Sequence, residues 1–207
     1  MLAAPTDRRS PVTETPSDLR SRRRVQLRAQ VQAAAVRLFA ERGFAATPVA
    51  DLARAAGISE RTYFRHFRTK EDAVLLDLED LARRVRAVDV DGRAPARLLE
   101  QIEGIYAELA EAMDEDDAGT RREAQLLIAR TPALREAATR RHREIMEDLR
   151  HRLVEAGVPD ADLLGRLLAQ IGTATLHAAL DAWADQEGAA SIAALYARSR
   201  ALLRALT

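Results

Sequence analysis

The segment Thr47–Lys70, TPVADLARAAGISERTYFRHFRTK, constrains this chain more than any other stretch. Thr47 is a good N-cap residue, and Pro48 suits the first position of a helix, where its missing N–H costs nothing. Gly57 can end that helix because glycine readily adopts the left-handed conformation of the C′ position. Ser59 can then cap a second short helix. Two short helices joined by a Gly-containing turn predict a helix-turn-helix, a motif that places its second helix in the major groove of DNA.

The second of these helices has distinct inner and outer faces. Tyr63 and Phe67 are four residues apart, which places both on the inner face. The side chains expected to face outward are polar or cationic, namely Glu60, Arg61, Thr62, Arg65, His66, Arg68 and Lys70. Arg61 and Thr62 at the helix start suit base edges, whereas Lys70 suits a phosphate. The alternative is an ordinary helical hairpin with a solvated basic face.

A longer segment, Arg23–Lys70, resembles the DNA-binding domain of the TetR family of bacterial transcriptional regulators. The matching pieces are AAAVRLFAERGFAATPVADLARAAGIS and RTYFRHFRTKEDAVL. Taken with the faces above, the resemblance implies DNA contacts from Thr47, Ser59, Glu60, Arg61, Thr62, Phe64, Arg65, His66 and Lys70. Two positions depart from the family pattern. Tyr63-Phe64 replaces the usual Leu-Tyr, which removes a phosphate-binding hydroxyl and gives Tyr63 the buried place, and Ala50 replaces a frequent basic residue.

The charge of the chain is balanced overall but divided between its two parts. Residues 1–70 contain 14 basic and 6 acidic side chains, whereas residues 71–207 contain 18 and 26. A basic first third joined to an acidic remainder is typical of a nucleic-acid-binding head on a body that does not bind nucleic acid. This asymmetry favours double-stranded DNA as a partner.

Composition and the positions of turn-forming residues divide the chain into three parts. Residues 1–21 are rich in proline and polar side chains and are expected to be a disordered tail. Residues 22–70 form the predicted helix-turn-helix domain, and residues 71–207 the predicted ligand-binding and dimerisation domain. The run Arg22–Arg24 either follows a DNA backbone or minor groove, or is a solvated helix start. Thr69 and Asp72 have capping-box spacing and are expected to start the helix that links head to body.

Helical periodicity continues to the end of the chain, so the predicted fold class is all-α. Helices are expected over residues 95–113, 118–129, 132–156, 160–186 and 189–206, and no stretch has the alternation of a strand. The absence of cysteine excludes a disulfide framework. No signal peptide and no transmembrane run are expected, which predicts a cytoplasmic protein without a membrane partner.

The last two helices carry apolar stripes that need a partner. One stripe contains Leu164, Leu168, Ile171, Thr175, Ala178 and Ala182, with Gly172, Ala174 and Ala179 beside it; the other contains Ile192, Leu195, Tyr196, Ser199, Leu202 and Leu206. Small residues allow helices to approach closely. The resemblance implies that both helices pair with their copies in a homodimer. The alternative is packing within one chain.

A ligand pocket for a small-molecule effector is expected among the body helices. Its predicted wall consists of Tyr106, Met113, Gln125, Met146, His177 and Trp183, although each could equally be plain core, and His177 a satisfied buried histidine. The stretch LLIARTPALREAATRRHREIMEDL resembles the family branch of the mycofactocin-system regulator, which is associated with fatty acyl-CoA ligands. Arg140, Arg141 and Arg143 then suit a phosphorylated headgroup, or form a charged exposed face.

The sequence offers no nucleophile–base set, phosphate loop or metal-ligand motif, so no catalytic residue, cofactor or metal is predicted. His142 and His151 are expected on the surface, and DEDDAG at Asp114–Gly119 as a solvated loop rather than a calcium site. The sequence therefore predicts a ligand-responsive transcriptional regulator. Its expected action is that of a repressor, bound as a homodimer to a palindromic operator and released by a small molecule. The alternatives are a sequence-independent architectural DNA binder and a helical enzyme.

Overall fold

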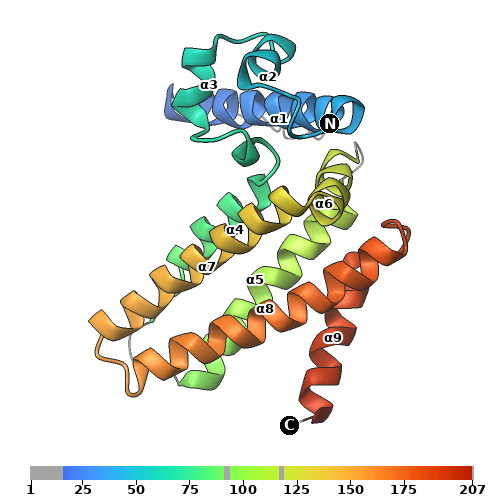
Figure 1. Cartoon of the computed structure of the whole chain (residues 1–207). Coiled ribbons are helices and arrows are strands. Elements are labelled where there is room, and N and C mark those ends of the chain that lie inside the picture. The colour runs from blue at the N-terminus through green and yellow to red at the C-terminus, as the bar shows by residue number, and fades with distance from the viewer. Residues whose placement is uncertain (1–15, 91–93, 117–118, 207) are drawn as a thin grey trace, which may run out of the picture.

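The computed structural model describes residues 16–90, 94–116 and 119–206, and every regular element in those ranges is helical (Figure 1). The all-α prediction is therefore confirmed. The elements in chain order are α1 (Pro16–Arg42), α2 (Val49–Ala55), α3 (Glu60–His66), the 3-10 turn η1 (Glu71–Ala73), α4 (Leu76–Arg86), α5 (Pro95–Asp114), α6 (Thr120–Arg130), α7 (Pro132–Glu155), α8 (Ala161–Asp185) and α9 (Ile192–Leu206). The five helices α5 to α9 lie within three residues of their expected bounds.

The first helix begins earlier than expected. It starts at Pro16 rather than near residue 22, and proline favours this position because its fixed φ is already helical. Residues 1–15 of the expected tail lie outside the described residues. The run Arg22–Arg24 is exposed on this helix.

Helices α1, α2 and α3 with the turn η1 form the head of the molecule (Figure 1). The inner face of α1 places Val31, Ala35 and Phe39 against Leu52 of α2 and Tyr63 of α3, and all five are nearly or fully buried. The helical spacing of Val31, Ala35 and Phe39 places them on one face of α1.

The link from head to body differs from the expected helix start. Asp72 Oδ2 accepts from the backbone N–H groups of Arg68 (2.9 Å) and Thr69 (3.0 Å), and the Asp72 N–H donates to Thr69 Oγ1 (3.4 Å). This reciprocal box therefore exists, but it closes the short turn η1, and α4 begins only at Leu76. Residues 67–75, which contain η1, therefore separate α3 from α4.

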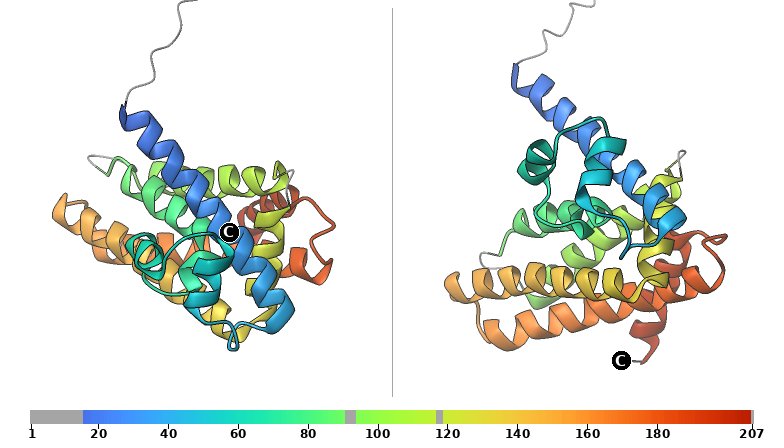
Figure 2. Two further views of the ribbon diagram at one scale, coloured as in Figure 1. Left: turned by 90° about the horizontal axis from the view of Figure 1, so that it is seen from above. Right: turned by 45° about the horizontal axis from the view of Figure 1, so that its top comes forward.

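Helices α4 to α9 form the body beneath the head, and α1 passes over them (Figure 2). Helices α7 and α8 run side by side, and α9 packs across α8 and α5. Their shared core contains Leu98, Ile102 and Tyr106 of α5 with Leu149 and Leu153 of α7. The body is thus a bundle whose core is separate from that of the head.

One body helix packs with the head. Ala124 and Ile128 of α6, with Leu134 and Ala137 at the start of α7, belong to the same buried cluster as the α1 core. The core of the head also continues past residue 70 through Ala73, Val74 and Leu75. The seam formed by α1 and α6 therefore connects the two parts predicted as separate domains.

Candidate functional site

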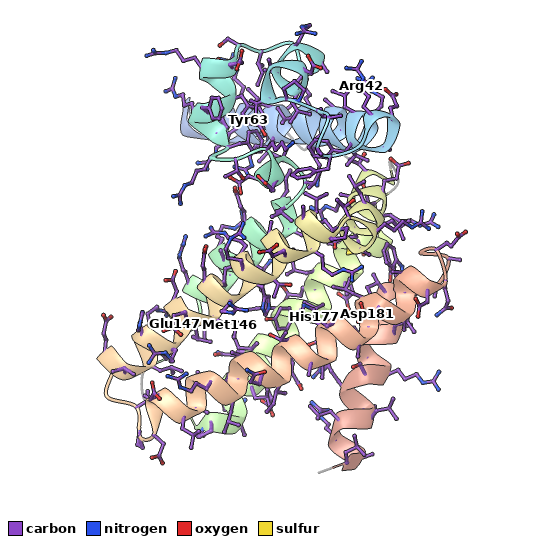
Figure 3. The ribbon with its side chains drawn as sticks, viewed as in Figure 1. Arg42, Tyr63, Met146, Glu147, His177 and Asp181 are labelled. Atoms are coloured by element: carbon purple, nitrogen blue, oxygen red, sulfur yellow. The ribbon has the colours of Figure 1, made fainter. Side chains whose placement is uncertain are left out.

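The helix α3 is held in place by a cap at its start and an aromatic anchor on its inner face. Ser59 Oγ accepts from the Thr62 N–H at 3.1 Å and lies 2.9 Å from Thr62 Oγ1, so the predicted cap is confirmed. Tyr63 is fully buried and donates its hydroxyl to the Thr69 carbonyl at 3.0 Å. Burial raises the pKa of Tyr63, and nearby Asp72 raises it further. Figure 3 shows Tyr63 on the side of α3 that faces the rest of the head.

The outer face of α3 carries the predicted DNA-contacting side chains. Glu60, Arg61, Phe64 and Arg65 are all exposed. Phe64 is 53% exposed and meets the Tyr63 ring edge-on, with the ring centroids 5.6 Å apart. The half-buried Thr62 uses its hydroxyl in the cap, which leaves its methyl group as the part available to a base. The structure therefore brings an arginine pair, a carboxylate and an aromatic ring onto one free helix face.

His66 lies at the end of α3 and is half-buried. The pKa of His66 is lowered, first by burial and then by Arg24, Arg28 and Arg65 around it. A neutral imidazole here would contact DNA as a hydrogen-bonding group rather than as a cation.

Thr47 is neither the N-cap of α2 nor an exposed DNA contact. Pro48 holds the cap position, and the Thr47 side chain is fully buried. Its hydroxyl donates back to the Gly43 carbonyl at 2.9 Å. Gly43, just after α1, has φ of +83°, a left-handed conformation that ends the helix. Thr47 therefore stabilises the C-terminal end of α1 instead of capping the start of α2.

Lys70 also points inward. Its ammonium donates to the Phe44 carbonyl at 2.7 Å and the Thr47 carbonyl at 3.3 Å, and it lies 4.1 Å from the centroid of the Phe44 ring. These contacts join the segment after α3 to the loop before α2. The predicted phosphate contact of Lys70 competes with them.

Arg28 connects α1 to α4 and to Phe67, the residue that follows α3. Its Nη2 atom lies 2.5 Å from Glu79 Oε2 of α4, and its guanidinium carbon lies 5.0 Å from the centroid of the Phe67 ring. Sequence reasoning missed this residue, because its partners are distant in the chain. The contact lies where head and body meet.

A cavity of about 280 Å3 lies inside the body beneath the head. Five of the six residues predicted for its wall line it: Tyr106, Met113, Gln125, His177 and Trp183. Met146 does not; it lies behind Tyr106, whose hydroxyl donates to Met146 Sδ at 3.6 Å. The remaining wall is mainly apolar and includes Leu78, Leu81, Leu109, Ile128, Leu176 and Leu180.

The cavity wall contains five polar residues that were not predicted, Asp77, Arg135, Thr139, His142 and Asp181, and two of them, His142 and Asp77, are largely buried. His142 was expected on the surface but is only 4% exposed; its Nε2 atom lies 2.6 Å from the Tyr106 hydroxyl and its Nδ1 3.3 Å from Thr173 Oγ1. Burial lowers the pKa of His142 to about 4, with nearby His177 adding to the effect, so the ring is neutral. Helical spacing could have indicated this burial, because His142 falls on the apolar stripe of α7 between Ala138 and Ile145.

The second is Asp77 of α4, a largely buried carboxylate. Gln125 Nε2 of α6 donates to its Oδ2 atom at 3.1 Å, and Arg121 Nε lies 3.7 Å from Oδ1. Burial raises the pKa of Asp77 despite these partners. The pair ties α4 to α6 at the cavity wall nearest the head.

The arginines predicted for a headgroup lie outside this cavity. Arg140 and Arg143 are exposed, and Arg141 pairs with Glu144 at 2.9 Å. Arg143 instead lines a neighbouring groove with His142 and His177. Figure 3 shows His177 and Asp181 on α8, with Met146 on α7.

The acidic stretch that begins at the last residue of α5 has a structural function. Asp114 accepts from the Ile192 N–H at 3.0 Å, the Ala193 N–H at 3.1 Å and Ser191 Oγ at 2.7 Å. It therefore caps α9 across 78 residues of sequence, and the prediction of a purely solvated loop is wrong for this residue. In the described part of the chain, no group of three His, Asp or Glu side chains could hold a metal ion.

The predicted stripes of α8 and α9 are partly buried within the chain and partly exposed. Leu168, Thr175 and Ala179 are buried within the chain, and a Cβ on Gly172 would lie 2.8 Å from Tyr106 Cε2. The small residues thus allow close packing inside one chain. The exposed apolar residues are Leu163 (60%), Leu167 (50%), Leu202 (57%) and Leu206 (84%), with Ala174 and Ala178 also exposed. None of the described helices is long and apolar enough to cross a membrane.

Comparison with known proteins agrees with this arrangement. Residues 32–75 match the family model described as "Bacterial regulatory proteins, tetR family". The HTH-type transcriptional repressor Rv3405c of Mycobacterium tuberculosis is 36% identical over 78 residues, which cover 38% of this chain. The HTH-type transcriptional regulator Mb3439c of Mycobacterium bovis matches to the same extent. The chain spans only 41% of the length of these curated relatives.

Two solved structures share the fold over most of the chain. The fatty acid degradation regulator FadR from Bacillus halodurans has a TM-score of 0.52 at 22% identity and covers 86% of this chain and 94% of its own. FadR from Bacillus subtilis, solved with stearoyl-CoA, has a TM-score of 0.53 at 23% identity and covers 84% and 96%.

The capped α3 and the turn before it place the head of the molecule in the class of helix-turn-helix DNA-binding domains. Within that class, residues 32–75 are similar to the DNA-binding segment of the TetR family.

Proposed function

We propose that this protein is a ligand-responsive transcriptional repressor that binds a palindromic operator as a homodimer and is released by a small molecule. The observation that carries the proposal is the outer face of α3. This helix is capped by Ser59 and anchored by Tyr63, while Arg61 and Arg65 remain exposed. An arginine at this place can pair with guanine in the major groove. One curated relative is itself described as a repressor.

The cavity supports the ligand response because its wall also belongs to the core of the head. Leu75 and Ile128 line the cavity and are part of the cluster that contains the α1 core. A molecule that fills the cavity would contact both α4 and α6, the two elements joined by Asp77 and Gln125. A ligand that binds one arrangement of these helices more tightly shifts the protein toward it.

A fatty acyl-CoA is the first ligand to test. The wall is mainly apolar, and a structural neighbour was solved with stearoyl-CoA. The acyl chain would occupy the cavity, and Arg140 and Arg143 are exposed on α7 for an anionic headgroup. In this proposal the protein acts on DNA in the cytoplasm and carries out no chemical conversion.

The ligand test combines native mass spectrometry and thermal shift with acyl-CoAs of several chain lengths. Leu180→Trp should fill the cavity and abolish the shift, whereas Leu180→Met conserves volume and should retain it. A shift with an unrelated drug-like compound and none with any acyl-CoA would contradict the acyl-CoA part alone.

Dimerisation is tested through the exposed apolar face. Ala178 and Leu167 lie on α8, and Leu202 on α9, with their side chains free in one chain. Ala178→Arg should give monomers in sedimentation and weaken operator binding, because a palindrome requires two heads. A wild-type protein that is folded and monomeric at micromolar concentration would contradict the dimer.

A further inference from the structure

We infer that Lys70 is a positioning residue that fixes the angle of the recognition helix, rather than a phosphate contact. The inference rests on the proposed DNA binding and concerns the only lysine in the chain. Its ammonium is bonded to two backbone carbonyls of the α1–α2 loop, from Phe44 at 2.7 Å and Thr47 at 3.3 Å.

Each contact of Lys70 joins elements that must move together to read DNA. Lys70 follows α3 by four residues, and the Tyr63 hydroxyl already ties the end of α3 to the Thr69 carbonyl beside it. The Phe44 and Thr47 carbonyls lie just before α2. The Lys70 ammonium therefore joins the segment after α3 to the loop before α2, so that α2 and α3 lie within one closed loop of the chain, called here the Lys70 ring.

The loop at the other end of this ring is itself rigid. Thr47 is fully buried and bonded to Gly43, and the Phe44 ring packs edge-on against Phe39 of α1 at 5.2 Å. The same Phe44 ring faces the Lys70 ammonium at 4.1 Å. A cation over a ring face and two carbonyls satisfies an ammonium without DNA, since lysine has three N–H donors and no acceptor.

A positioning role and a phosphate contact of Lys70 predict different salt dependences of the DNA affinity. A lysine that neutralises a phosphate contributes about one unit to the slope of log affinity against log salt concentration. A lysine bonded inside the head contributes nothing to that slope, but its loss misplaces Arg61 and the other reading groups. Its removal should therefore weaken specific binding more than non-specific binding.

The binding test compares Lys70→Met with wild type on operator and scrambled duplexes across a salt series. Lys70→Met should lose about tenfold in operator affinity per half-site, as expected for a lost charge-assisted hydrogen bond, with the salt slope unchanged. Equal loss on both duplexes, with the slope reduced by about one per half-site, would overturn the inference. Arg83→Met, which removes an exposed cation from α4, is the control for charge alone.

A spectroscopic measurement on the wild-type protein keeps the test independent of whether Lys70→Met folds. Because the chain has a single lysine, 15N-lysine labelling gives one ammonium resonance. In the free protein this resonance should be visible with slowed hydrogen exchange, and it should shift little on operator binding. A resonance absent from the free protein that appears in the complex with coupling to 31P would overturn the inference. If wild type binds no duplex, the DNA-binding proposal fails, while the resonance of the free protein still reports the ring.

Discussion

The head and the body of this protein use similar helices but determine their structures differently. In the head, the cap of α3 spans three residues, from Ser59 to Thr62, and the Tyr63 anchor reaches six residues along the chain. In the body, Asp114 caps α9 across 78 residues, and Glu103 binds Arg200 and Arg204 about a hundred residues away. The cap and the anchor of α3, the helix proposed to read DNA, are therefore local, whereas the contacts that hold α9 in the body are long-range.

The seam between α1 and α6 is an exception to this contrast, because residues of the body helices are buried there in the core of the head. Leu134 belongs to α7 in sequence but is fully buried in the core of the head. Leu149 of the same helix is fully buried in the body core. The two leucines permit a matched comparison within one helix.

The largest expected effect is that of Leu134→Ala. Deleting a buried leucine costs about 2–5 kcal/mol of folding stability, and here the loss should also open the head. Hydrogen exchange should rise in α1 to α3 for Leu134→Ala, and in α5 and α8 for Leu149→Ala. Chemical denaturation measures the free energies. If Leu134→Ala leaves the exchange of α1 unchanged, the seam does not join the two parts.

The next effect concerns pH and the body. The pKa of His142 is lowered to about 4 by burial, so the folded state stays neutral while the unfolded state takes up a proton near pH 6.5. Stability should therefore fall as pH drops from about 6.5 to 4, by up to about 3 kcal/mol. His142→Gln should flatten this dependence of the melting temperature, whereas His151→Gln, at an exposed site, should not. An unchanged profile in His142→Gln would assign the effect elsewhere.

A comparable free-energy change, in operator binding rather than in folding, is expected when an exposed side chain of the head is removed. Arg61→Ala should cost about 1–3 kcal/mol per half-site and relax the preference at one base position. The fold should be unaffected, because the side chain is exposed. Fluorescence anisotropy on operators mutated one base pair at a time measures both effects, and a uniform loss at all positions would show that Arg61 does not read sequence.

The smallest effects are those of the two helix caps. Ser59→Ala and Asp114→Ala should each cost about 1 kcal/mol, because each leaves helix N–H groups without an acceptor. The cost of Ser59→Ala should appear in operator affinity, and that of Asp114→Ala in the thermal stability of the body. Reversed readouts would contradict the division between a reading head and a sensing body.

The same division explains how much the sequence could predict. Ser59, Tyr63 and Gly57 were identified because caps, turn residues and helical spacing act over a few residues. Five of the six residues predicted for a pocket wall line the cavity, because adaptable side chains on inner faces meet in a helical bundle. Asp77 and Arg28 were missed because their partners, Gln125 and Glu79, come from other helices.

Other patterns permit two structures. Thr47 precedes Pro48, which reads as a cap, yet its hydroxyl closes the preceding helix. The small residues of α8 suit a dimer interface and equally suit the close approach of Tyr106. Sequence spacing identifies such residues as important but does not choose the partner.

The outer face of α3 is proposed to read a defined DNA sequence. Selection of bound duplexes from a random pool, followed by anisotropy on the recovered and scrambled sequences, measures this property. We expect an enriched site with two-fold symmetry, bound at least a thousandfold more tightly than a scrambled duplex at physiological salt. No enriched sequence, or equal affinity for both duplexes, would contradict it and indicate an architectural DNA binder.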